Sequence, residues 1–395
     1  MPPRALPVLP DWPDEVVGIA ATLERAGFET WFVGGALRDR LLGSPTMDVD
    51  LATAARPEEV RRLFPRTVAV GARFGTVGVL DRQRVLHEVT TFRKDVETDG
   101  RHAVVEFGAT LEEDLARRDF TINALAYHPI RQEWRDPHAG AADLEGRVIR
   151  AVGNPATRFA EDYLRILRAL RFAARLRFII EPETWRAAVA AAPGLAGLSA
   201  ERVRDEWFKG LGSAQSIAAL VTLWHEVGAA RVWLPELAAA YPFADDPPAT
   251  RDPVILSAGL CEQPDLVLER LRASNEEIVR GRALRTGPVA PLGNDAPSVR
   301  RWMAEVQDAA DDLMQLAGLR AGAAPEWSGV VAGIRSRGEA TSRAGLALNG
   351  ADLLALGVPA GPELGRLLSR LLDAVLEDPA LNSREALLAL AGGWR

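Results

Sequence analysis

Two aspartates separated by one residue, Asp48 and Asp50, are the side chains in this sequence with the clearest potential for chemistry. They lie in the stretch Met47-Asp48-Val49-Asp50-Leu51-Ala52-Thr53, whose polar and apolar alternation predicts a β-strand. Side chains two residues apart on a strand point to the same face, so both carboxylates would point at one place. Such a pair is destabilising unless a cation lies between the carboxylates, and Mg²⁺ prefers carboxylate oxygens together with substrate phosphates. The spacing indicates a metal site, although an Asp-X-Asp pair is also common on a solvated turn.

A glycine-rich turn precedes these aspartates by about a dozen residues. The apolar run Trp31-Phe32-Val33 leads into Gly34 and Gly35 and then into a helical pattern that carries Arg38. Two adjacent glycines let backbone N–H groups approach a phosphate, the helix start adds a favourable dipole, and Arg38 can donate a fork of hydrogen bonds. The turn therefore suits an anion, although the same pattern also serves as plain chain geometry between a strand and a helix.

A third acid, Glu88, interrupts the apolar, strand-forming run around Val85-Leu86-His87-Glu88-Val89. If this strand lies beside the strand of Asp48 and Asp50, Glu88 could complete a cluster of three carboxylates. The alternative is a strand whose other face is solvated. His87 would then point to the opposite face, and no catalytic role is assigned to it.

Two later segments combine acids and arginines at helical spacing. The first, 111–125, is predicted to be a helix that offers Arg118 as a cation for phosphate, Asp119 as an acceptor for ribose hydroxyls and Asn123 as a hydrogen-bonding amide. Surface pairing between its acids and arginines is the plainer interpretation.

The second segment, 160–175, is predicted to be one amphipathic helix. An apolar stripe occupies one face, whereas Asp162, Arg165 and Arg168 lie on the opposite face and Arg171 lies at the border of the stripe. An acid and arginines in a row present both an acceptor and forked donors, as reading a base edge without a template requires. A solvated face with internal ion pairs is the alternative.

The composition limits the possible classes of protein. The net charge is −7, which argues against a protein that coats nucleic acid indiscriminately, and the single cysteine, Cys261, excludes an intramolecular disulfide and a cysteine-based zinc site. Cys261 is expected in the core. The start of the chain does not resemble an export signal and no apolar run is long enough for a membrane helix, so a cytoplasmic location is expected.

The element pattern changes near the middle of the chain. Residues 1–150 alternate strand-like and helical segments, whereas from about Thr157 onward Ala, Leu, Arg and Glu recur at helical spacing between stretches that contain Pro and Gly. A length of 395 residues fits two to four domains. The expected fold class is α+β, with a mixed head followed by an all-helical part.

Five segments together resemble a known family. The segments GGALRD, MDVDLAT, HEVTTF, RRDFTINA and EDYLRILRALRF occur in the order and spacing of the bacterial class II tRNA nucleotidyltransferases, which are the CCA-adding enzymes, and of the related poly(A) polymerases. The resemblance is strong over residues 28–215, extends to 348–382 and is weak over 240–345. It implies a polymerase-β-like nucleotidyltransferase head (1–150) followed by a helical neck for base recognition (151–215), a body (216–300) and a tail that binds tRNA (301–395).

The resemblance also implies roles for particular residues. Gly34, Gly35 and Arg38 match the triphosphate-binding turn, and Asp48 and Asp50 match the metal-binding aspartates. Glu88 occupies the place of a third carboxylate. The remaining matches fall into three groups: Arg118, Asp119 and Asn123 for ribose and triphosphate, Asp162 and Arg165 for the base, and Arg168 and Arg171 for triphosphate or base.

The implied activity is addition of C, C and A to the 3′ end of tRNA from CTP and ATP with two Mg²⁺ ions, and the sequence does not fix an oligomeric state. Enzymes that add only CC or only A, and poly(A) polymerases, are the closest alternatives. A catalytically silent RNA-binding protein with the same fold is an alternative of another class, and the intact Asp48, Asp50 and Arg118 argue against it. The segment 93–110 lies where family members carry a flexible loop needed for A addition; it is slightly short but present, which favours full CCA addition. No His-Asp dipeptide occurs, so an appended His-Asp phosphohydrolase activity is not expected.

Overall fold

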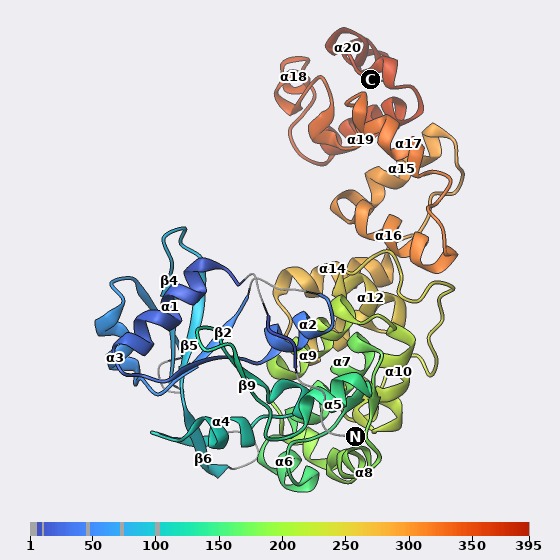
Figure 1. The fold of residues 1–395 in the computed structure, drawn as a ribbon. Coiled ribbons are helices and arrows are strands. Elements are labelled where there is room, and N and C mark those ends of the chain that lie inside the picture. The colour runs from blue at the N-terminus through green and yellow to red at the C-terminus, as the bar shows by residue number, and fades with distance from the viewer. Residues whose placement is uncertain (1–5, 10–11, 45–47, 72–74, 99–102, 395) are drawn as a thin grey trace. The chain divides into compact units, whose positions relative to one another are not determined.

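The computed structural model of the chain describes residues 6–9, 12–44, 48–71, 75–98 and 103–394 (Figure 1). The chain forms two compact units, Met1–Pro235 and Glu236–Arg395. The first unit contains both the head and the segment predicted as the neck. The division into head, neck, body and tail at residues 150, 215 and 300 stays a prediction. Because the site residues named above all precede residue 236, they belong to one unit.

A mixed sheet organises the first unit, and its order across the described residues is β3-β4-β5-β2-β1-β8-β9. The pairing of β2 with β5 is parallel, and the other neighbours are antiparallel. The strands are β1 (Thr30–Val33), β2 (Asp50–Thr53), β3 (Thr67–Gly71), β4 (Thr76–Leu80), β5 (Leu86–Thr91), β8 (Ala126–His128) and β9 (Glu133–Arg135).

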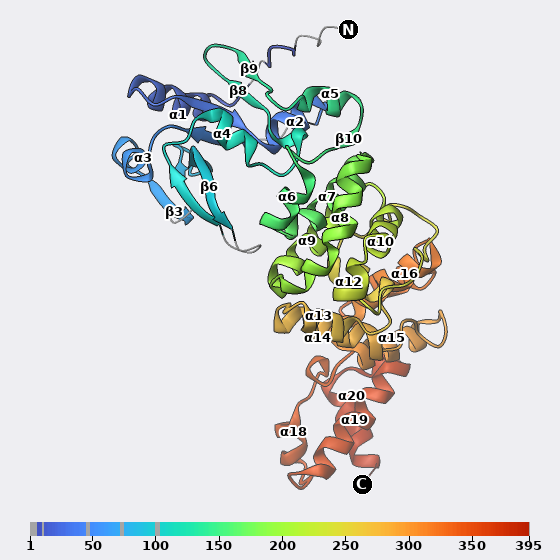
Figure 2. The same cartoon turned by 90° about the horizontal axis from the view of Figure 1, so that it is seen from below.

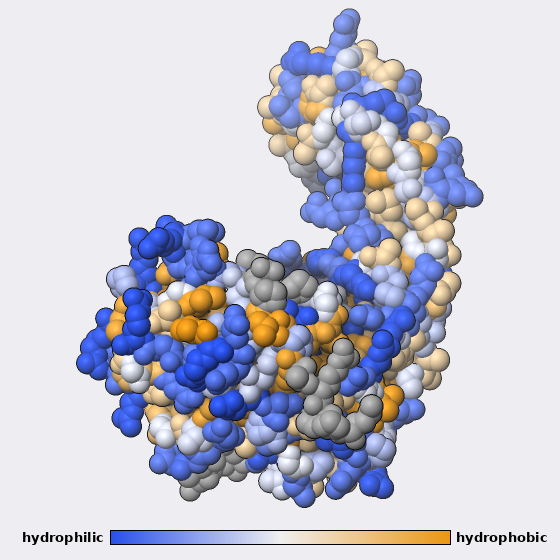
Figure 3. All heavy atoms as spheres, in the orientation of Figure 1, coloured by the Kyte–Doolittle hydropathy of each residue, from blue (hydrophilic) through white to orange (hydrophobic). Residues whose placement is uncertain are grey.

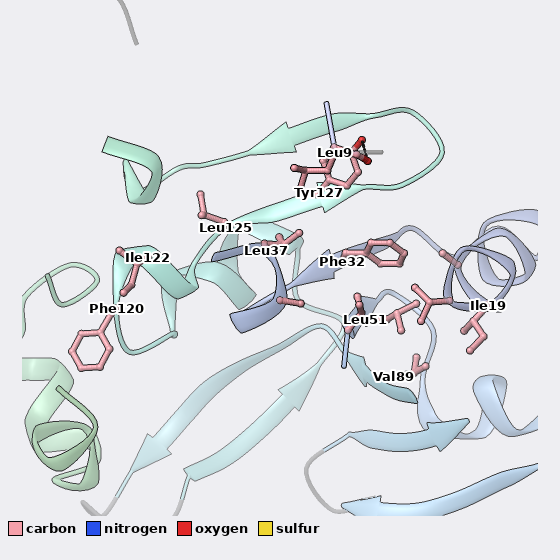
Figure 4. Packing of buried hydrophobic residues seen from close by; sticks show 14 of the residues in the cluster. Leu9, Ile19, Phe32, Leu37, Leu51, Val89, Phe120, Ile122, Leu125 and Tyr127 are labelled. Carbon is pink, nitrogen blue, oxygen red and sulfur yellow. Dashed lines mark hydrogen bonds between the residues drawn. The ribbon is translucent and has the colours of Figure 1, made fainter. Parts of the chain in front are cut away.

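The two faces of this sheet have different surroundings. On one face, the helices α1 (Asp14–Arg25) and α3 (Pro57–Leu63) pack over the sheet, with buried side chains such as Ile19, Leu51 and Val89 between the layers (Figure 4). On the other face, a smaller buried cluster joins strands β1 and β2 to α4 (Leu111–Ala116). The alternation of side chains along the strands therefore directs apolar residues to the helices and leaves part of the second face for polar ones.

The rest of the first unit is almost entirely helical, as expected from the sequence. Its helices cluster together beside the sheet in both views (Figures 1 and 2). Two pairs of described strands lie outside the seven-stranded sheet, the antiparallel pair β6 with β7 and the short parallel pair β10 with β11. The remaining elements are α2 (Gly35–Leu41), β6 (Arg93–Thr98), β7 (Ala103–Phe107), η2 (Thr121–Asn123), α5 (Gly140–Glu145), β10 (Val148–Ile149), α6 (Pro155–Glu161), α7 (Leu164–Leu176), β11 (Ile179–Ile180), α8 (Pro182–Ala191), η3 (Ala192–Gly197), α9 (Ala200–Ser213), α10 (Ile217–Glu226) and α11 (Ala229–Trp233).

Helices and short helical turns form the second unit. A core of leucines and valines binds the last helices to one another. Cys261 is buried and free, as expected. The elements are α12 (Pro253–Leu260), α13 (Pro264–Arg270), α14 (Asn275–Thr286), α15 (Ala296–Val306), η4 (Gln307–Ala309), α16 (Ala310–Ala321), α17 (Ser328–Ser336), η5 (Arg343–Gly345), α18 (Gly350–Ala355), α19 (Pro362–Glu377), η6 (Pro379–Leu381) and α20 (Arg384–Gly393).

The prediction of one helix over 111–125 was wrong. The helix α4 begins with a capping box, in which Thr110 Oγ1 accepts from Glu113 N–H and Glu113 Oε2 accepts from Thr110 N–H, but it ends at Ala116. The backbone is extended at Phe120, which is buried and forms an isolated β-bridge with Ala151. Asp119 Oδ1 accepts from Phe120 N–H at 2.8 Å, a local side-chain bond that competes with a helix.

The prediction of one helix over 160–175 was also wrong at its start. α6 ends at Glu161, Asp162 has an extended backbone (φ −156°, ψ 104°), and α7 begins at Leu164. Asp162 Oδ1 accepts from Leu164 N–H at 3.0 Å, so this aspartate satisfies an N–H at the start of the new helix instead of lying inside a longer one. The predicted apolar stripe is otherwise confirmed, since Ile166, Leu167, Leu170, Ala173 and Ala174 are all buried.

The expectations about membrane helices and about the start of the chain stand as follows. Within the described ranges, no helix is both long and apolar enough to cross a membrane. Hydrophilic residues dominate the face drawn in Figure 3, with apolar residues in small separate groups. The start of the chain that was expected not to be an export signal, residues 1–4, lies outside the described residues.

Candidate nucleotide and metal site

A cleft of about 840 Å³ opens in the first unit between the second face of the sheet and the helices α7 and α9. Every site residue proposed from the sequence lines this cleft. The residues come from strands, turns and helices that are spread over more than a hundred positions of the chain, from Gly34 to Arg171. These residues are Gly34, Gly35, Arg38, Asp48, Asp50, Glu88, Arg118, Asp119, Asn123, Asp162, Arg165, Arg168 and Arg171.

Asp48 and Asp50 lie at the edge of the sheet, as the alternation predicted. Hydrogen-bonded pairing begins only at Asp50, which lies opposite Val33 of β1, so the strand is shorter than predicted. The side-chain alternation nevertheless extends further back, because Asp48 and Asp50 are exposed while Val49 and Leu51 are buried. Both carboxylates therefore belong to the cleft side, and the apolar residues hold the strand to the core.

Glu88 lies next to these aspartates. β2 and β5 pair in parallel with Leu51 opposite Val89, so the preceding residues, Asp50 and Glu88, share the cleft face of neighbouring strands. The predicted neighbour relation of the two strands is thus confirmed. His87 points to the other face, where its Nε2 lies 3.1 Å from Asp81 Oδ2, in agreement with its exclusion from the site.

The electrostatics of Asp50 favour binding of a cation. Desolvation, and then the nearby charges of Asp48 and Glu88, raise the pKa of Asp50 to about 6, while Arg118 acts in the opposite direction. Among the residues that the structure describes, no three acids, histidines or cysteines are arranged to hold a metal ion by themselves. A divalent ion at this place would therefore combine Asp48 and Asp50 with oxygens of a substrate or of water, as is typical for Mg²⁺.

The raised pKa of Asp50 leads to a prediction about pH and metal ions. In metal-free protein the protonated form of Asp50 stabilises the fold below the unfolded pKa of 3.8, and this contribution is lost as pH rises through about 6. A divalent ion competes with that proton, so we expect Mg²⁺ to raise the Tm more at pH 7.5 than at pH 5. Thermal unfolding with Mg²⁺ or with EDTA measures this difference. In the variant Asp50→Asn the Mg²⁺ effect should be small at both pH values, and an equal Mg²⁺ effect at both pH values in the unaltered protein would contradict the assignment.

The glycine turn approaches the carboxylates closely. Gly34 has φ +79°, and a Cβ at this position would lie 3.3 Å from Asp50 Oδ2 and 3.4 Å from Arg118 Nη1. Only glycine adopts this backbone freely and leaves room for both groups. Gly34 is also the residue before α2, so the N-terminal N–H groups of this helix face the cleft beside the acids.

Arg38 lines the cleft but is less available than the sequence indicated. Its side chain is buried, its Nη1 donates to Asn123 Oδ1 at 2.6 Å, and its Nε donates to Asp39 Oδ1 at 2.8 Å. The guanidinium also lies over the ring of Phe172. These contacts tie the turn to η2 and α7, so Arg38 holds the shape of the glycine turn in addition to lining the cleft.

The residues after α4 form a connected network. Arg118 Nη2 donates to the buried Asp114 Oδ2 at 3.1 Å, which aims the guanidinium toward Gly34 and Asp50. Burial alone would raise the pKa of Asp119, but Arg168 and the hydrogen bonds from Asn123 and Phe120 N–H lower it to about 2. Asp119 is thus an acceptor at every physiological pH.

Asp162 and Arg165 both lie at the start of α7, on the side of the cleft opposite the acids. Asp162 Oδ2 accepts from Arg202 Nη2 of α9 at 2.7 Å. Arg165 Nη1 donates to Glu161 Oε2 at 2.6 Å, and its Nη2 donates to Arg117 O at 3.0 Å. The ion-paired interpretation and the functional interpretation of this segment are therefore compatible, because the pairs orient side chains that also line the cleft.

Sequence reasoning missed several residues of the same cleft, among them Arg175, Arg202 and Lys209. The sequence did contain a sign that α9 contributes to the site. Glu206 lies on the apolar side of an amphipathic helical pattern, between Val203 and Trp207, where burial of an unpaired acid is unfavourable. In the structure Glu206 is buried and accepts from Arg171 Nε at 2.6 Å. Thr76, Thr90, Arg93 and Arg117 were likewise not singled out.

Comparison with known proteins identifies relatives along most of the chain. Residues 30–150 match the model of the poly A polymerase head domain, residues 177–241 match a probable RNA and SrmB-binding site of polymerase A, and residues 336–391 match a putative domain 2 of tRNA nucleotidyltransferase. A CCA-adding enzyme of Streptococcus gordonii is 49% identical over 52% of this chain, and that match spans about half of the relative, 51%.

Two relatives match nearly the whole chain. A CCA-adding enzyme of Geobacillus kaustophilus is 36% identical over 95% of this chain and 96% of its own length. The crystal structure of the Bacillus stearothermophilus CCA-adding enzyme in complex with CTP matches with a TM-score of 0.84 and 33% identity, covering 96% of both chains. Nucleotidyltransferases of this kind depend on a divalent metal ion, which agrees with the electrostatics of Asp50. The chain therefore belongs to the family of the CCA-adding enzymes, within the tRNA nucleotidyltransferases.

Proposed function

We propose that this protein adds C, C and A to the 3′ end of tRNA, taking the nucleotides from CTP and ATP and releasing pyrophosphate. One observation carries the proposal: a single cleft is lined by the carboxylates of Asp48 and Asp50 and by a wall of arginines from the segment after α4, from α7 and from α9. Such a cleft pairs a cation-binding edge with a triphosphate-binding wall. The near full-length likeness to enzymes of this activity supports it.

In the proposed reaction, the 3′-oxygen of the RNA attacks the α-phosphorus of the nucleotide and its proton passes to solvent. The bond from the α-phosphorus to the oxygen that bridges the α- and β-phosphates breaks, and pyrophosphate leaves with that oxygen. Mg²⁺ is the proposed ion; bound by Asp48 and Asp50, it would favour ionisation of the 3′-hydroxyl and offset charge on the leaving pyrophosphate. Glu88 adds negative charge beside these two carboxylates. The protein contributes mainly positioning and charge stabilisation.

The triphosphate would lie between the glycine turn and the arginine wall. Backbone N–H groups at Gly34 and Gly35 approach it without side-chain hindrance, and Arg118, Arg168 and Arg171 supply forked donors. Asp119 and Asn123, held by Arg168 and Arg38, would accept from and donate to the ribose. These assignments follow the geometry of the cleft and the family motifs together.

The base would be read by Asp162 and Arg165. C and A each present an amino donor beside a ring-nitrogen acceptor, a pattern that a carboxylate and a guanidinium match, whereas U presents an acceptor in place of the amino group. Because both side chains are anchored by Arg202 and Glu161, their positions are fixed before a nucleotide arrives. The protein thus takes the place of a template.

The proposal also assigns the parts of the chain. The head (1–150) and neck (151–215) would carry the chemistry, and the body (216–300) and tail (301–395) would hold tRNA by shape and phosphates. We propose a cytoplasmic location, because tRNA and nucleoside triphosphates are available there. The β6–β7 hairpin occupies the segment expected to help A addition, although residues 99–102 lie outside the described residues.

A primer-extension assay tests the function. The protein is incubated with Mg²⁺ and tRNAs that end before the tail, after C and after CC, with CTP and ATP singly and together, and product length is read to one nucleotide. Addition of three residues followed by arrest is the expected result. Arrest after two residues, addition of A only, or long A tracts would identify a CC-adding enzyme, an A-adding enzyme or a poly(A) polymerase instead, and binding of tRNA without extension would identify a silent relative.

A further inference from the structure

A pair of threonine hydroxyls lies in the cleft on the side of the acids. Thr76 of β4 and Thr90 of β5 are direct cross-strand partners, and their Oγ1 atoms lie 3.0 Å apart. Both residues line the cleft and both are half-buried. Thr90 lies two residues after Glu88, so its side chain shares the face of that acid. Nothing in the mechanism above uses this pair.

The charges around the cleft restrict what can lie against the threonines. The arginines and Lys209 come mainly from the segment after α4, from α7 and from α9, whereas the acids Asp48, Asp50 and Glu88 lie at the sheet, beside the threonine pair. A triphosphate is attracted directly to the first wall, whereas the acids of the second wall would contact it only through a bound cation. The sheet wall therefore suits the less charged reactant, which is the 3′-terminal nucleotide of the RNA that must bring its hydroxyl to Asp48 and Asp50.

The same sheet face is open beyond Glu88. Val70 and Leu86 are 43% and 38% exposed, and their side chains flank Gly78, which lies opposite Glu88. Arg93, which follows β5 by two residues, also lines the cleft, and one arginine suits the single charge of a phosphodiester. Among the described residues, the buried cluster on this side of the sheet joins α4 to β1, β2 and β8, so a polynucleotide end can lie along the part of the face that β4 and β5 form.

Resting on the proposed function, we propose that Thr76 and Thr90 bind the 2′-hydroxyl of the terminal acceptor nucleotide and so make the enzyme select RNA ends over DNA ends. Each hydroxyl offers one donor and two acceptor positions, and their mutual bond uses only one donor and one acceptor. The remaining donor and acceptors match a ribose hydroxyl, which is both donor and acceptor and lies on the carbon next to the attacking 3′-oxygen. Thr76 and Thr90 are specificity-determining residues in this proposal.

The test compares two acceptors that differ by one oxygen. A tRNA that lacks its tail is prepared with either a ribose or a 2′-deoxyribose at its 3′ end, and kcat/KM for CMP addition is measured with Mg²⁺ and the full chain. The unaltered protein should prefer the ribose end by roughly 3- to 10-fold, the range that one neutral hydrogen bond contributes. In Thr90→Val the preference should fall to about 1, through a loss on the ribose end alone.

Matched variants separate recognition from structure. Thr90→Ser keeps the hydroxyl and should keep the preference, whereas Thr76→Val should lose it as Thr90→Val does. Valine has the shape and strand propensity of threonine, so the Tm and the KM for CTP should be unchanged. An unaltered ribose-to-deoxyribose ratio in Thr90→Val, or an effect confined to the KM for CTP, would overturn the inference. If the unaltered protein extends neither acceptor, the proposed function itself is wrong.

Discussion

Replacing Asp50 by asparagine is expected to lower nucleotide incorporation by at least about a thousandfold, since charge stabilisation by a bound metal ion supplies several kcal/mol and each 1.4 kcal/mol is about tenfold in rate. Asparagine has the shape of aspartate but is a poorer ligand for a hard cation. Asp50 lies at the start of β2 opposite Val33, beside Asp48, Glu88 and Gly34. Single-turnover addition of CMP to a tRNA that lacks its tail measures the effect.

The fold should survive this substitution. Desolvation of the carboxylate between the walls of the cleft, and then the charges of Asp48 and Glu88, disfavour the ionised form of Asp50. In metal-free protein at pH 7.5 a neutral asparagine should therefore leave the Tm equal or slightly higher. Glu133→Gln on β9 is the matched control, because Glu133 is an exposed strand acid outside the cleft. Retention of a tenth or more of the activity in Asp50→Asn would show that Asp50 is not a ligand of the reacting metal.

Replacing Asp162 by asparagine is expected to reduce the preference for CTP over UTP by roughly a hundredfold, because sites built on hydrogen bonds reject a mismatched base through unpaired polar groups. The carboxylate can only accept, as the amino group of C requires, whereas the amide of asparagine can also donate to the carbonyl oxygen of U. Arg202 and the Leu164 N–H hold the aspartate in place, and the asparagine can keep one of these two contacts. The measured quantity is the ratio of kcat/KM for the two nucleotides.

A suitable control lies on the neighbouring helix α8. Glu183 is an exposed acid in its first turn, and Glu183→Gln should leave both activity and preference unaltered. The prediction for Asp162 is contradicted if kcat/KM falls equally for CTP and UTP, because that pattern would indicate a structural role at the start of α7 and not base selection. Arg165→Ala provides a second test of the same pair, with the same expected loss of preference.

Much of the site could be predicted from the spacing of residues in the sequence, because the local backbone determines where these side chains point. The alternation around Asp48 and Asp50 and the double glycine at Gly34 depend only on neighbours in the chain, and the structure agrees with both. The apolar stripe of α7 could be predicted from the sequence in the same way, and its residues are buried. The predicted roles of these residues in catalysis stay predictions until the variants are measured.

The parts that the sequence did not reveal depend on contacts between distant segments. The helical periodicity of the sequence continues through Asp119 and through Asp162, but in the structure both helices end earlier. Phe120 is buried and forms a β-bridge with Ala151, and Asp162 accepts a hydrogen bond from Arg202. Arg38 similarly became a buried link to Asn123, which lies 85 positions away. A threonine pair such as Thr76 and Thr90 gives no signal before the register of β4 and β5 is known.

The arginines of the cleft have a common property that matters for ionic strength. Each of Arg118, Arg165, Arg168, Arg171, Arg175 and Arg202 already contacts a carboxylate of the protein. An arriving nucleotide therefore meets arginines whose charge is already offset by acids of the protein, so its affinity varies less steeply with salt than the number of arginines alone implies. Polyanions that do not fit the cleft therefore gain little binding free energy from these arginines. Shape complementarity, and not net charge, then determines which molecule binds.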